Sequence, residues 1–259
     1  MKVILNGCGL AYEVRGEIGI PLVLIHGFGL NRRFWYEMIS SKLDKSHVVL
    51  VDVRGHGESD APKGSYSMSL LAEDVLALLD YLGIKKAIIC GHSMGGYISL
   101  AFAAAFPERL AGLGLITSRA RADSEIQRQN RYALIEKIQR ESVAALAASL
   151  APRLTKNAAL VEQAYKIIIE TPAQGIIGAA YGMAERPDRM DLLCEIKVPS
   201  LVVAGEEDQI VSIAEAKHLA EQLPQGIFLP IAAVGHLPML EQPGTLGDGL
   251  LLLKNQVDG

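Results

Sequence analysis

The stretch "IICGHSMGGYISLA", residues 88–101, decides the fold, because an apolar run stops at a glycine, presents a serine and continues with a helical composition. The serine, Ser93, stands at the centre of the pentapeptide "GHSMG" (91–95), which fits the pattern G-x-S-x-G. On a sharp turn between a buried strand and a helix, such a serine has a strained backbone that tolerates only small residues two positions away. The stretch therefore predicts a strand, a turn and a helix, with Ser93 as a candidate nucleophile.

Strands and helices alternate on both sides of this turn. Residues 67–83 carry apolar side chains at helical spacing and end at Gly83, which predicts a helix between two strands. Such alternation implies crossover connections and a mostly parallel sheet. The apolar runs themselves are typical of strands buried on both faces: "PLVLIHGFG" (21–29), "HVVLVDVRGHG" (47–57) and "KVPSLVVAG" (197–205).

One long segment departs from this alternation. Residues 118–186 contain no strand-like run and are predicted to form several short helices, separated by Pro152, Pro172 and Gly175. The segment is much longer than a simple crossover, which needs about a dozen residues. We therefore expect a helical cap insertion over residues 118–186 and a core domain formed by residues 1–117 and 187–259.

The predicted cap has an apolar stripe at three- and four-residue steps. Most of such a stripe must pack on other helices or on the core, and the remainder can roof a closed pocket over Ser93. Because aromatic residues make up only 5% of the chain, we expect mainly aliphatic pocket walls, with Phe28 and Trp35 added from a loop. The stripe consists of Leu134, Ile135, Ile138, Val143, Leu146 and Leu150.

A serine hydroxyl is a weak nucleophile near neutral pH and needs a histidine base that a carboxylate orients. His236 is the best candidate for this base, because it follows the last predicted strand in a glycine- and proline-containing loop, "VGHLPMLEQP". The other five histidines stand at a strand end, inside the turn around the serine, in a glycine-rich turn or on surface-type segments: His26, His92, His56, His47 and His218.

The candidate carboxylate is Asp208, in the loop "GEEDQIV" (205–211) that leaves a predicted strand. It completes the chain order Ser, Asp, His that is typical of serine hydrolases with this kind of turn. Glu206 and Glu207 are neighbouring alternatives, although an acidic run is usually solvated. Asp123, after the preceding strand, is a further alternative.

Negative charge that develops on the substrate during the reaction needs hydrogen-bond donors. The backbone N–H of Met94, directly after the serine, is one candidate. The second is the backbone N–H of Phe28, which lies between two glycines that let the main chain approach a substrate.

Composition excludes several classes of protein. The 259 residues are 50% hydrophobic and 21% charged, as in a globular chain, and the net charge of −4 without a basic cluster argues against nucleic acid as a partner. The apolar runs are too short for a signal-peptide core or a membrane span, so we expect a cytoplasmic protein. Cys8, Cys90 and Cys194 are scattered and predict neither a disulfide framework nor a metal site.

The chain resembles the α/β-hydrolase superfamily, in its cap-bearing, esterase-like branch. The resemblance implies the α/β-hydrolase fold, with a mostly parallel eight-stranded sheet flanked by helices. One departure is the stretch "GTLGDGLLLL" (244–253), whose Gly247 and Gly249 should weaken the last helix by about 1 kcal/mol each. The motifs that carry the resemblance run from end to end: "HGFG" (26–29), "DVRGHGESD" (52–60), "GHSMGG" (91–96), "GEEDQIV" (205–211) and "GHLPMLEQP" (235–243).

The resemblance implies a serine hydrolase that cleaves small to medium carboxylic esters through an acyl-enzyme, with Ser93, His236 and Asp208 as the triad. This chemistry requires no metal and no organic cofactor. An enol-lactonase or a thioesterase would use the same residues, and a carbon–carbon bond hydrolase is a more distant alternative. A non-catalytic receptor for a small molecule is the alternative from a different functional class.

Overall fold

The computed structural model describes residues 1–259 and contains one sheet of eight strands. The strand order is β1-β2-β4-β3-β5-β6-β7-β8. The pairs β1–β2 and β2–β4 are antiparallel and the other five pairs are parallel, which confirms the predicted mostly parallel sheet. The strands are β1 (Lys2–Leu5), β2 (Cys8–Arg15), β3 (Ile18–Ile25), β4 (Ser46–Val51), β5 (Ala87–His92), β6 (Leu110–Ile116), β7 (Ser200–Gly205) and β8 (Gly226–Ile231).

The central strands bury both faces, because successive side chains point to opposite sides of a sheet. In β3, Val23 and Ile25 belong to an apolar core on one face. Leu22 and Leu24 belong to a second apolar core on the other face. The continuous apolar runs of the sequence therefore form a sheet with a helical layer on each side.

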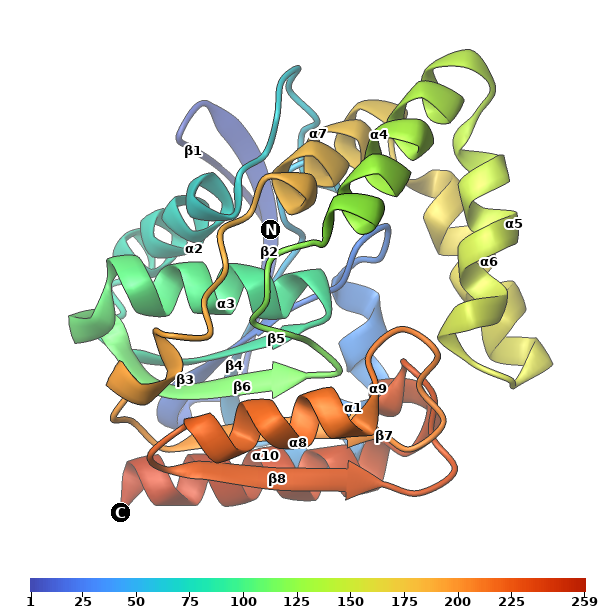
Figure 1. The fold of residues 1–259 in the computed structure, drawn as a ribbon. Coiled ribbons are helices and arrows are strands. Elements are labelled where there is room, and N and C mark those ends of the chain that lie inside the picture. The colour runs from blue at the N-terminus through green and yellow to red at the C-terminus, as the bar shows by residue number, and fades with distance from the viewer.

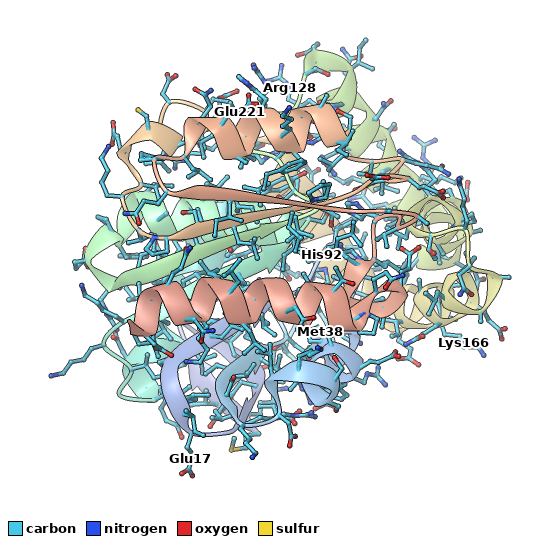
Figure 2. All side chains as sticks on the ribbon, turned by 90° about the horizontal axis from the view of Figure 1, so that it is seen from below. Glu17, Met38, His92, Arg128, Lys166 and Glu221 are labelled. Atoms are coloured by element: carbon cyan, nitrogen blue, oxygen red, sulfur yellow. The ribbon has the colours of Figure 1, made fainter.

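The helices complete these two layers. α2, α3 and α8 cover one face, and α1 and α10 cover the other. Seen from below, α8 and α10 lie on opposite sides of the sheet (Figure 2). None of the helices combines the length and the apolar character needed to cross a membrane. The bounds in this part of the chain are α1 (Tyr36–Met38), α2 (Met68–Tyr81), α3 (Met94–Ala105), α8 (Ile213–Gln222), α9 (Pro238–Glu241) and α10 (Pro243–Asp258).

Between β6 and β7 the chain forms four helices, α4 to α7, which we name the helical insertion. A capping box at Ser124 starts α4, and the Asn157 side chain caps α6. In Figure 1 the arrows of β6 and β8 point toward the side on which α5 and α6 lie. The division into a core of residues 1–117 and 187–259 and a cap of residues 118–186 stays a prediction. The bounds are α4 (Glu125–Arg140), α5 (Val143–Leu154), α6 (Ala158–Glu170) and α7 (Ala173–Ala184).

The last helix forms in full despite its two glycines. α10 runs without interruption through Gly247 and Gly249. A Cβ atom at Gly247 would lie 2.6 Å from the Cβ atom of Lys42, and one at Gly249 would lie 2.5 Å from a methyl group of Leu229. Glycine at these positions therefore allows close packing, and the cost of its lower helix propensity stays a prediction.

Asp123 stands at the centre of a buried ion cluster that ties the start of α4 to the end of α7. Its carboxylate accepts hydrogen bonds from Arg131 and from Arg186, whose Nη1 lies 2.7 Å away. The side chains of Asp123 and Arg186 are 1% and 3% exposed. Burial raises the pKa of Asp123, but the two arginines outweigh burial, so that the pKa lies below its usual value.

We expect Asp123→Asn to destabilise the protein by about 3 kcal/mol, because it leaves buried guanidinium groups without a counter-charge. The melting temperature should fall on the order of 5–10 °C in calorimetry near neutral pH. Since the folded pKa is lowered, this contribution is present above the pKa of an unfolded aspartate and disappears as the pH falls through the folded value. The difference between variant and wild type should therefore shrink in acid.

Glu136→Gln is the matched control, because Glu136 pairs with Arg140 on the surface of α4 at 3.2 Å. An exposed pair of this kind contributes about 0–1 kcal/mol. Equal melting temperatures for Asp123→Asn and Glu136→Gln would contradict a stabilising role for the buried cluster.

Candidate active site

Ser93 lies on a sharp turn between β5 and α3, as the pattern predicts. Its backbone angles, φ 52° and ψ −113°, are unusual for a residue with a side chain and mark local strain. A Cβ atom at Gly91 would collide with the backbone of Gly95, and one at Gly95 would collide with the carbonyl of Ile25. The two glycines of the pattern are therefore required for this close backbone approach.

His236 and Asp208 lie together at the carboxyl side of the sheet, on the loops after β8 and β7. The Nδ1 atom of His236 is 2.7 Å from Oδ2 of Asp208, and both side chains are almost completely buried. The second carboxylate oxygen, Oδ1, accepts the backbone N–H groups of Ile210 at 2.7 Å and Val211 at 3.1 Å. The carboxylate is thus fixed in one orientation, with one oxygen free for the imidazole.

The acidic residues that the sequence offers as alternatives to Asp208 do not contact His236. Glu207 pairs with Lys156 on the surface, at 2.8 Å, and Glu206 is exposed. Asp123 is held in the arginine cluster at the start of α4. Asp208 is therefore the carboxylate that contacts His236.

Ser93 and His236 line the same cavity. Ser93 Oγ donates to no protein group, and His236 uses only Nδ1 in its contact with Asp208. In proteins without a bound substrate, contacts between nucleophile and base are often long, and they tighten when substrate binds. The arrangement leaves the hydroxyl and the imidazole Nε2 available to a ligand.

Neighbouring polar groups fix the backbone of both residues. His92 Nε2 donates to the carbonyl of His236 at 2.8 Å, and the Thr117 hydroxyl donates to the same carbonyl at 3.2 Å. Ser118 Oγ donates to the carbonyl of Ser93 at 2.7 Å. Burial, together with the nearby His236, lowers the pKa of His92 well below its usual value, so its ring stays neutral. His92 therefore links the turn at Ser93 to the backbone of His236.

His26 and His56 are also buried, with ring centres 5.3 Å apart. The backbone N–H of Val53 donates to His26 Nε2 at 3.0 Å, and His56 Nδ1 lies 3.1 Å from the carbonyl of Arg54. Burial lowers the pKa of His26 to about 4 and that of His56 to about 3. Both are neutral structural residues in the loops beside Phe28.

Two backbone N–H groups are available near the serine. Met94 begins α3, and the first amides of a helix have no acceptor within the helix. Phe28 lies outside every helix and strand, and its N–H donates to no group of the protein. Both residues stand where the sequence places the donors, and their role toward an oxyanion stays a prediction.

The helical insertion contacts the loop of the histidine directly. The carbonyl of Leu154, the last residue of α5, accepts the backbone N–H of His236 at 2.7 Å. A Cβ atom at Gly235 would lie 2.9 Å from the same carbonyl oxygen. Movement of α5 would therefore move the backbone of His236.

The cavity at Ser93 has a volume of about 360 Å³ and lies between the core and the helical insertion. The expected stripe contributes three leucines, Leu134, Leu146 and Leu150. The expectation of mainly aliphatic walls is wrong, because 9 of the 18 lining residues are polar. Trp35 is fully buried and does not line the cavity. Its ring packs edge-to-face with the ring of His92, with ring centres 6.4 Å apart.

Sequence reasoning missed the charged residues of this cavity, Arg119, Arg131 and Arg153. A signal was present for two of them. Arg131 precedes Leu134 by three positions and Arg153 follows Leu150 by three, so each shares a helix face with a predicted lining leucine. No motif marks Arg119, which follows β6 by three residues.

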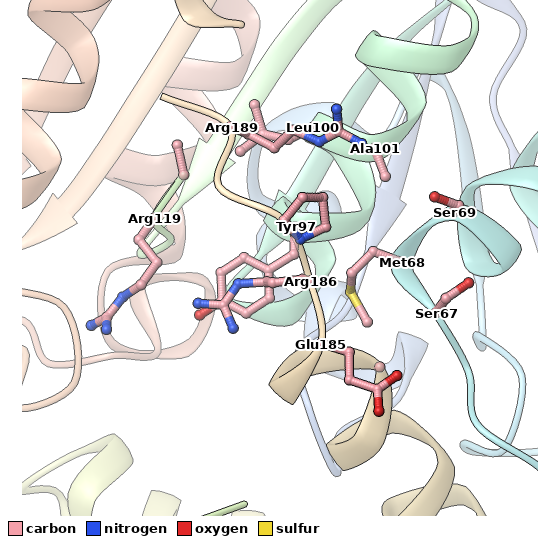
Figure 3. Close-up of a pocket in the computed structure, with 13 residues that line it drawn as sticks. Ser67, Met68, Ser69, Tyr97, Leu100, Ala101, Arg119, Glu185, Arg186 and Arg189 are labelled. Carbon is pink, nitrogen blue, oxygen red and sulfur yellow. The ribbon is translucent and has the colours of Figure 1, made fainter. Parts of the chain in front are cut away.

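A second, smaller cavity of about 120 Å³ lies beside the first, with Tyr97 and Arg119 on the wall that they share. The Arg186 guanidinium stacks over the Tyr97 ring, 4.0 Å from its centre (Figure 3). Arg186 lines the small cavity only, whereas Tyr97 lines both.

The chain is similar to proteins of known family over nearly its whole length. The family described as the alpha/beta hydrolase fold matches residues 20–243. The 3-oxoadipate enol-lactonase 2 of Acinetobacter baylyi is 31% identical, over 90% of this chain and 88% of the relative. The structure of a thermophilic esterase from Thermogutta terrifontis, malate bound, matches with a TM-score of 0.95 at 36% identity and covers 100% of this chain and 99% of that one. The enol-lactonase from Burkholderia xenovorans LB400 matches with a TM-score of 0.90 at 26% identity, over 98% and 99% of the two chains.

Proposed function

The chain belongs to the α/β-hydrolase family and is a hydrolase, and from this premise we propose that it cleaves small carboxylic esters with Ser93 as nucleophile. The observation that carries the proposal is the 2.7 Å contact between His236 Nδ1 and Asp208 Oδ2, in a cavity that Ser93 also lines. A serine on a strained turn beside an oriented imidazole is the arrangement that nucleophilic acyl transfer needs.

In the proposed reaction Ser93 Oγ attacks the ester carbonyl carbon while His236 Nε2 takes the hydroxyl proton. The Nδ1–H group of the imidazole donates to Asp208, which stabilises the imidazolium. The backbone N–H groups of Phe28 and Met94 donate to the oxyanion of the tetrahedral intermediate. The intermediate collapses, and the alkoxide leaves with the proton from Nε2. Water then attacks the acyl-enzyme by the same steps and releases the acid.

The relatives support an ester or a lactone as the reacting group. Two of them are named esterase or enol-lactonase and align over nearly the full chain. A lactone is a cyclic ester, so the same nucleophile, base and donors would open it. We therefore propose esters as the substrate class and lactones as the closest second candidate.

The cavity volume predicts a preference for short acyl chains. About 360 Å³ is near the lower end of the range for small-molecule sites, about 300–1,000 Å³, so a long alkyl chain has no space inside. Among neutral p-nitrophenyl esters we expect kcat/KM to be highest for acetate or butyrate. For palmitate it should be at least about 100-fold lower. That factor corresponds to well under half of the free energy that the apolar contacts of a long chain would contribute if the cavity held it.

The same measurement tests the proposal against its alternatives. Rates in tributyrin emulsion should show no jump at the solubility limit, because a short acyl chain fits the cavity beside the helical insertion and needs no interface. A maximum at palmitate, or activation by the emulsion, would contradict the small cavity. Failure of every ester and lactone together with tight binding of a small ligand would favour a receptor.

A further inference from the structure

The cavity at Ser93 is positively charged beyond what ester hydrolysis requires. Its lining includes three arginines, Arg119, Arg131 and Arg153, and no aspartate or glutamate. The chain as a whole is acidic, with a net charge of −4, so this local excess of positive charge runs against the composition. A cleft lined by one sign of charge attracts ligands of the other sign.

Arg153 is the least engaged of the three. It lies in the last turn of α5 and is exposed, and its side chain makes no ion pair and no hydrogen bond within the protein. Its neighbour Leu154 accepts the backbone N–H of His236 at 2.7 Å. The residue with the unpaired guanidinium is therefore the direct neighbour of the residue that contacts the backbone of the proposed base.

Arg119 is held close to the nucleophile from the other side. Its neighbour Ser118 donates to the carbonyl of Ser93, and its own Nη2 donates to the carbonyl of Ile210 in the loop of Asp208. The Nε atom is buried without a hydrogen-bond partner, at 3.4 Å from a carboxylate oxygen of Glu215. Nε and Nη2 thus hold the guanidinium in place, and Nη1, which makes no hydrogen bond within the protein, is left to donate to an anionic ligand in the cavity.

Arg131 adds charge to the same wall. It pairs with Asp123, but Asp123 is also paired with Arg186, so one carboxylate faces two guanidinium groups. One positive charge of this cluster is left without a counter-ion. The cavity thus combines two arginines that other protein groups hold, Arg119 and Arg131, with the unpaired Arg153, around apolar leucine side chains.

We propose that the substrate is a small ester or lactone that carries a free carboxylate, which Arg119 and Arg153 bind while Ser93 attacks the ester carbonyl. This inference rests on the proposed function and specifies its substrate class. Guanidinium and carboxylate groups match each other in planar, two-point hydrogen bonding. The leucines of the helical insertion contact the uncharged part of the molecule. Hydrolysis adds one water across the ester C–O bond and yields a dicarboxylate and an alcohol, or a hydroxy dicarboxylate from a lactone.

The test compares two esters of equal shape that differ in charge, mono-4-nitrophenyl adipate and its terminal amide, 4-nitrophenyl adipamate. The measured quantity is the ratio of their kcat/KM values. We expect the wild-type ratio to favour the carboxylate about tenfold or more, the effect of one charge-assisted hydrogen bond. Arg153→Gln should lower this ratio about tenfold, and 0.5 M NaCl should lower it as well, since salt screens the attraction.

Arg119→Lys is the second variant, because it keeps the charge but loses two-point geometry, and it should lower the ratio mainly through a higher KM for the adipate ester. Arg140→Gln is the control. Arg140 lies on the exposed face of α4, paired with Glu136, and its loss should leave the ratio unchanged.

The outcomes separate this inference from the proposed function. A wild-type ratio near one, or a ratio that Arg153→Gln and Arg140→Gln change equally, would overturn the carboxylate site while ester hydrolysis stands. If neither ester is cleaved, the proposed function fails, and calorimetry with adipate and adipamide decides the inference alone. Binding of adipate but not of adipamide, lost in Arg153→Gln, would support it, and equal or absent binding of both would overturn it.

Discussion

Ser93→Ala should lower kcat/KM for p-nitrophenyl butyrate by roughly 10⁴- to 10⁶-fold, because no other group can form the acyl-enzyme. The variant keeps a Cβ atom at a residue with φ 52°, so the strain of the turn and the packing of α3 are unchanged. Its melting temperature should therefore lie within about 2 °C of wild type, as for other small changes without a packing effect. Rates under pseudo-first-order conditions and a thermal melt of the same sample measure both quantities.

Ser99→Ala is the matched control for this result. Ser99 lies in the same helix, is fully buried, and donates to the carbonyl of Gly95 at 2.9 Å, away from the cavity. It should keep the wild-type rate within a few-fold. If Ser93→Ala retained more than about a tenth of the activity, the role of Ser93 as nucleophile would be wrong.

Asp208→Asn should lower kcat by about 10⁴-fold through the wrong histidine tautomer. The N–H groups of Ile210 and Val211 already point at Oδ1, so the amide oxygen of the asparagine takes that place. Its NH₂ group then faces His236 Nδ1, which must be unprotonated to accept it. The ring proton moves to Nε2, which can no longer take the proton of Ser93.

Glu206→Gln and Glu207→Gln serve as controls on the same loop and should lose less than about threefold, because exposed charges contribute little. Steady-state rates with one soluble ester compare the three variants. A large loss in Glu207→Gln with little loss in Asp208→Asn would move the acid to the neighbouring residue.

The layered fold was predictable because its signals are local. Each parallel strand is buried on both faces, so β3, β4, β5 and β7 appear in the sequence as continuous apolar runs. The turn at Ser93 was predictable because only glycine fits at Gly91 and Gly95, and this requirement is visible as a spacing. A strand, a turn and a helix within fourteen residues need no knowledge of distant contacts.

The histidine and the aspartate could be proposed because the carboxyl ends of parallel strands share one edge of the sheet. His236 and Asp208 are far apart in sequence, but each follows a strand, β8 or β7, that ends at this edge. The sequence favoured Asp208 over Asp123, but it did not show which contacts engage Asp123. These contacts come from Arg131 in α4 and from Arg186, which follows α7 by two residues.

The sequence predicted the character of the cavity only in part. The composition indicated aliphatic walls, but composition does not say which face of each helix meets the serine. Arg131 and Arg153 line the cavity because α4 and α5 turn those faces inward, and this depends on packing between helices. Gly247 and Gly249 show the same limit, since their close contacts with Lys42 and Leu229 appear only when α10 packs on its neighbours.

The most direct test of the central claim, that Ser93 is the nucleophile of an acyl-transfer site, is the mass of its covalent adduct. A fluorophosphonate forms a stable bond only with a serine that a neighbouring base activates. After digestion, mass spectrometry should find one phosphonyl group per chain, on the peptide that contains Ser93. The label should be absent in Ser93→Ala and should form much more slowly in Asp208→Asn. An unlabelled Ser93 in enzyme that still hydrolyses esters, or a label on another residue, would contradict the claim.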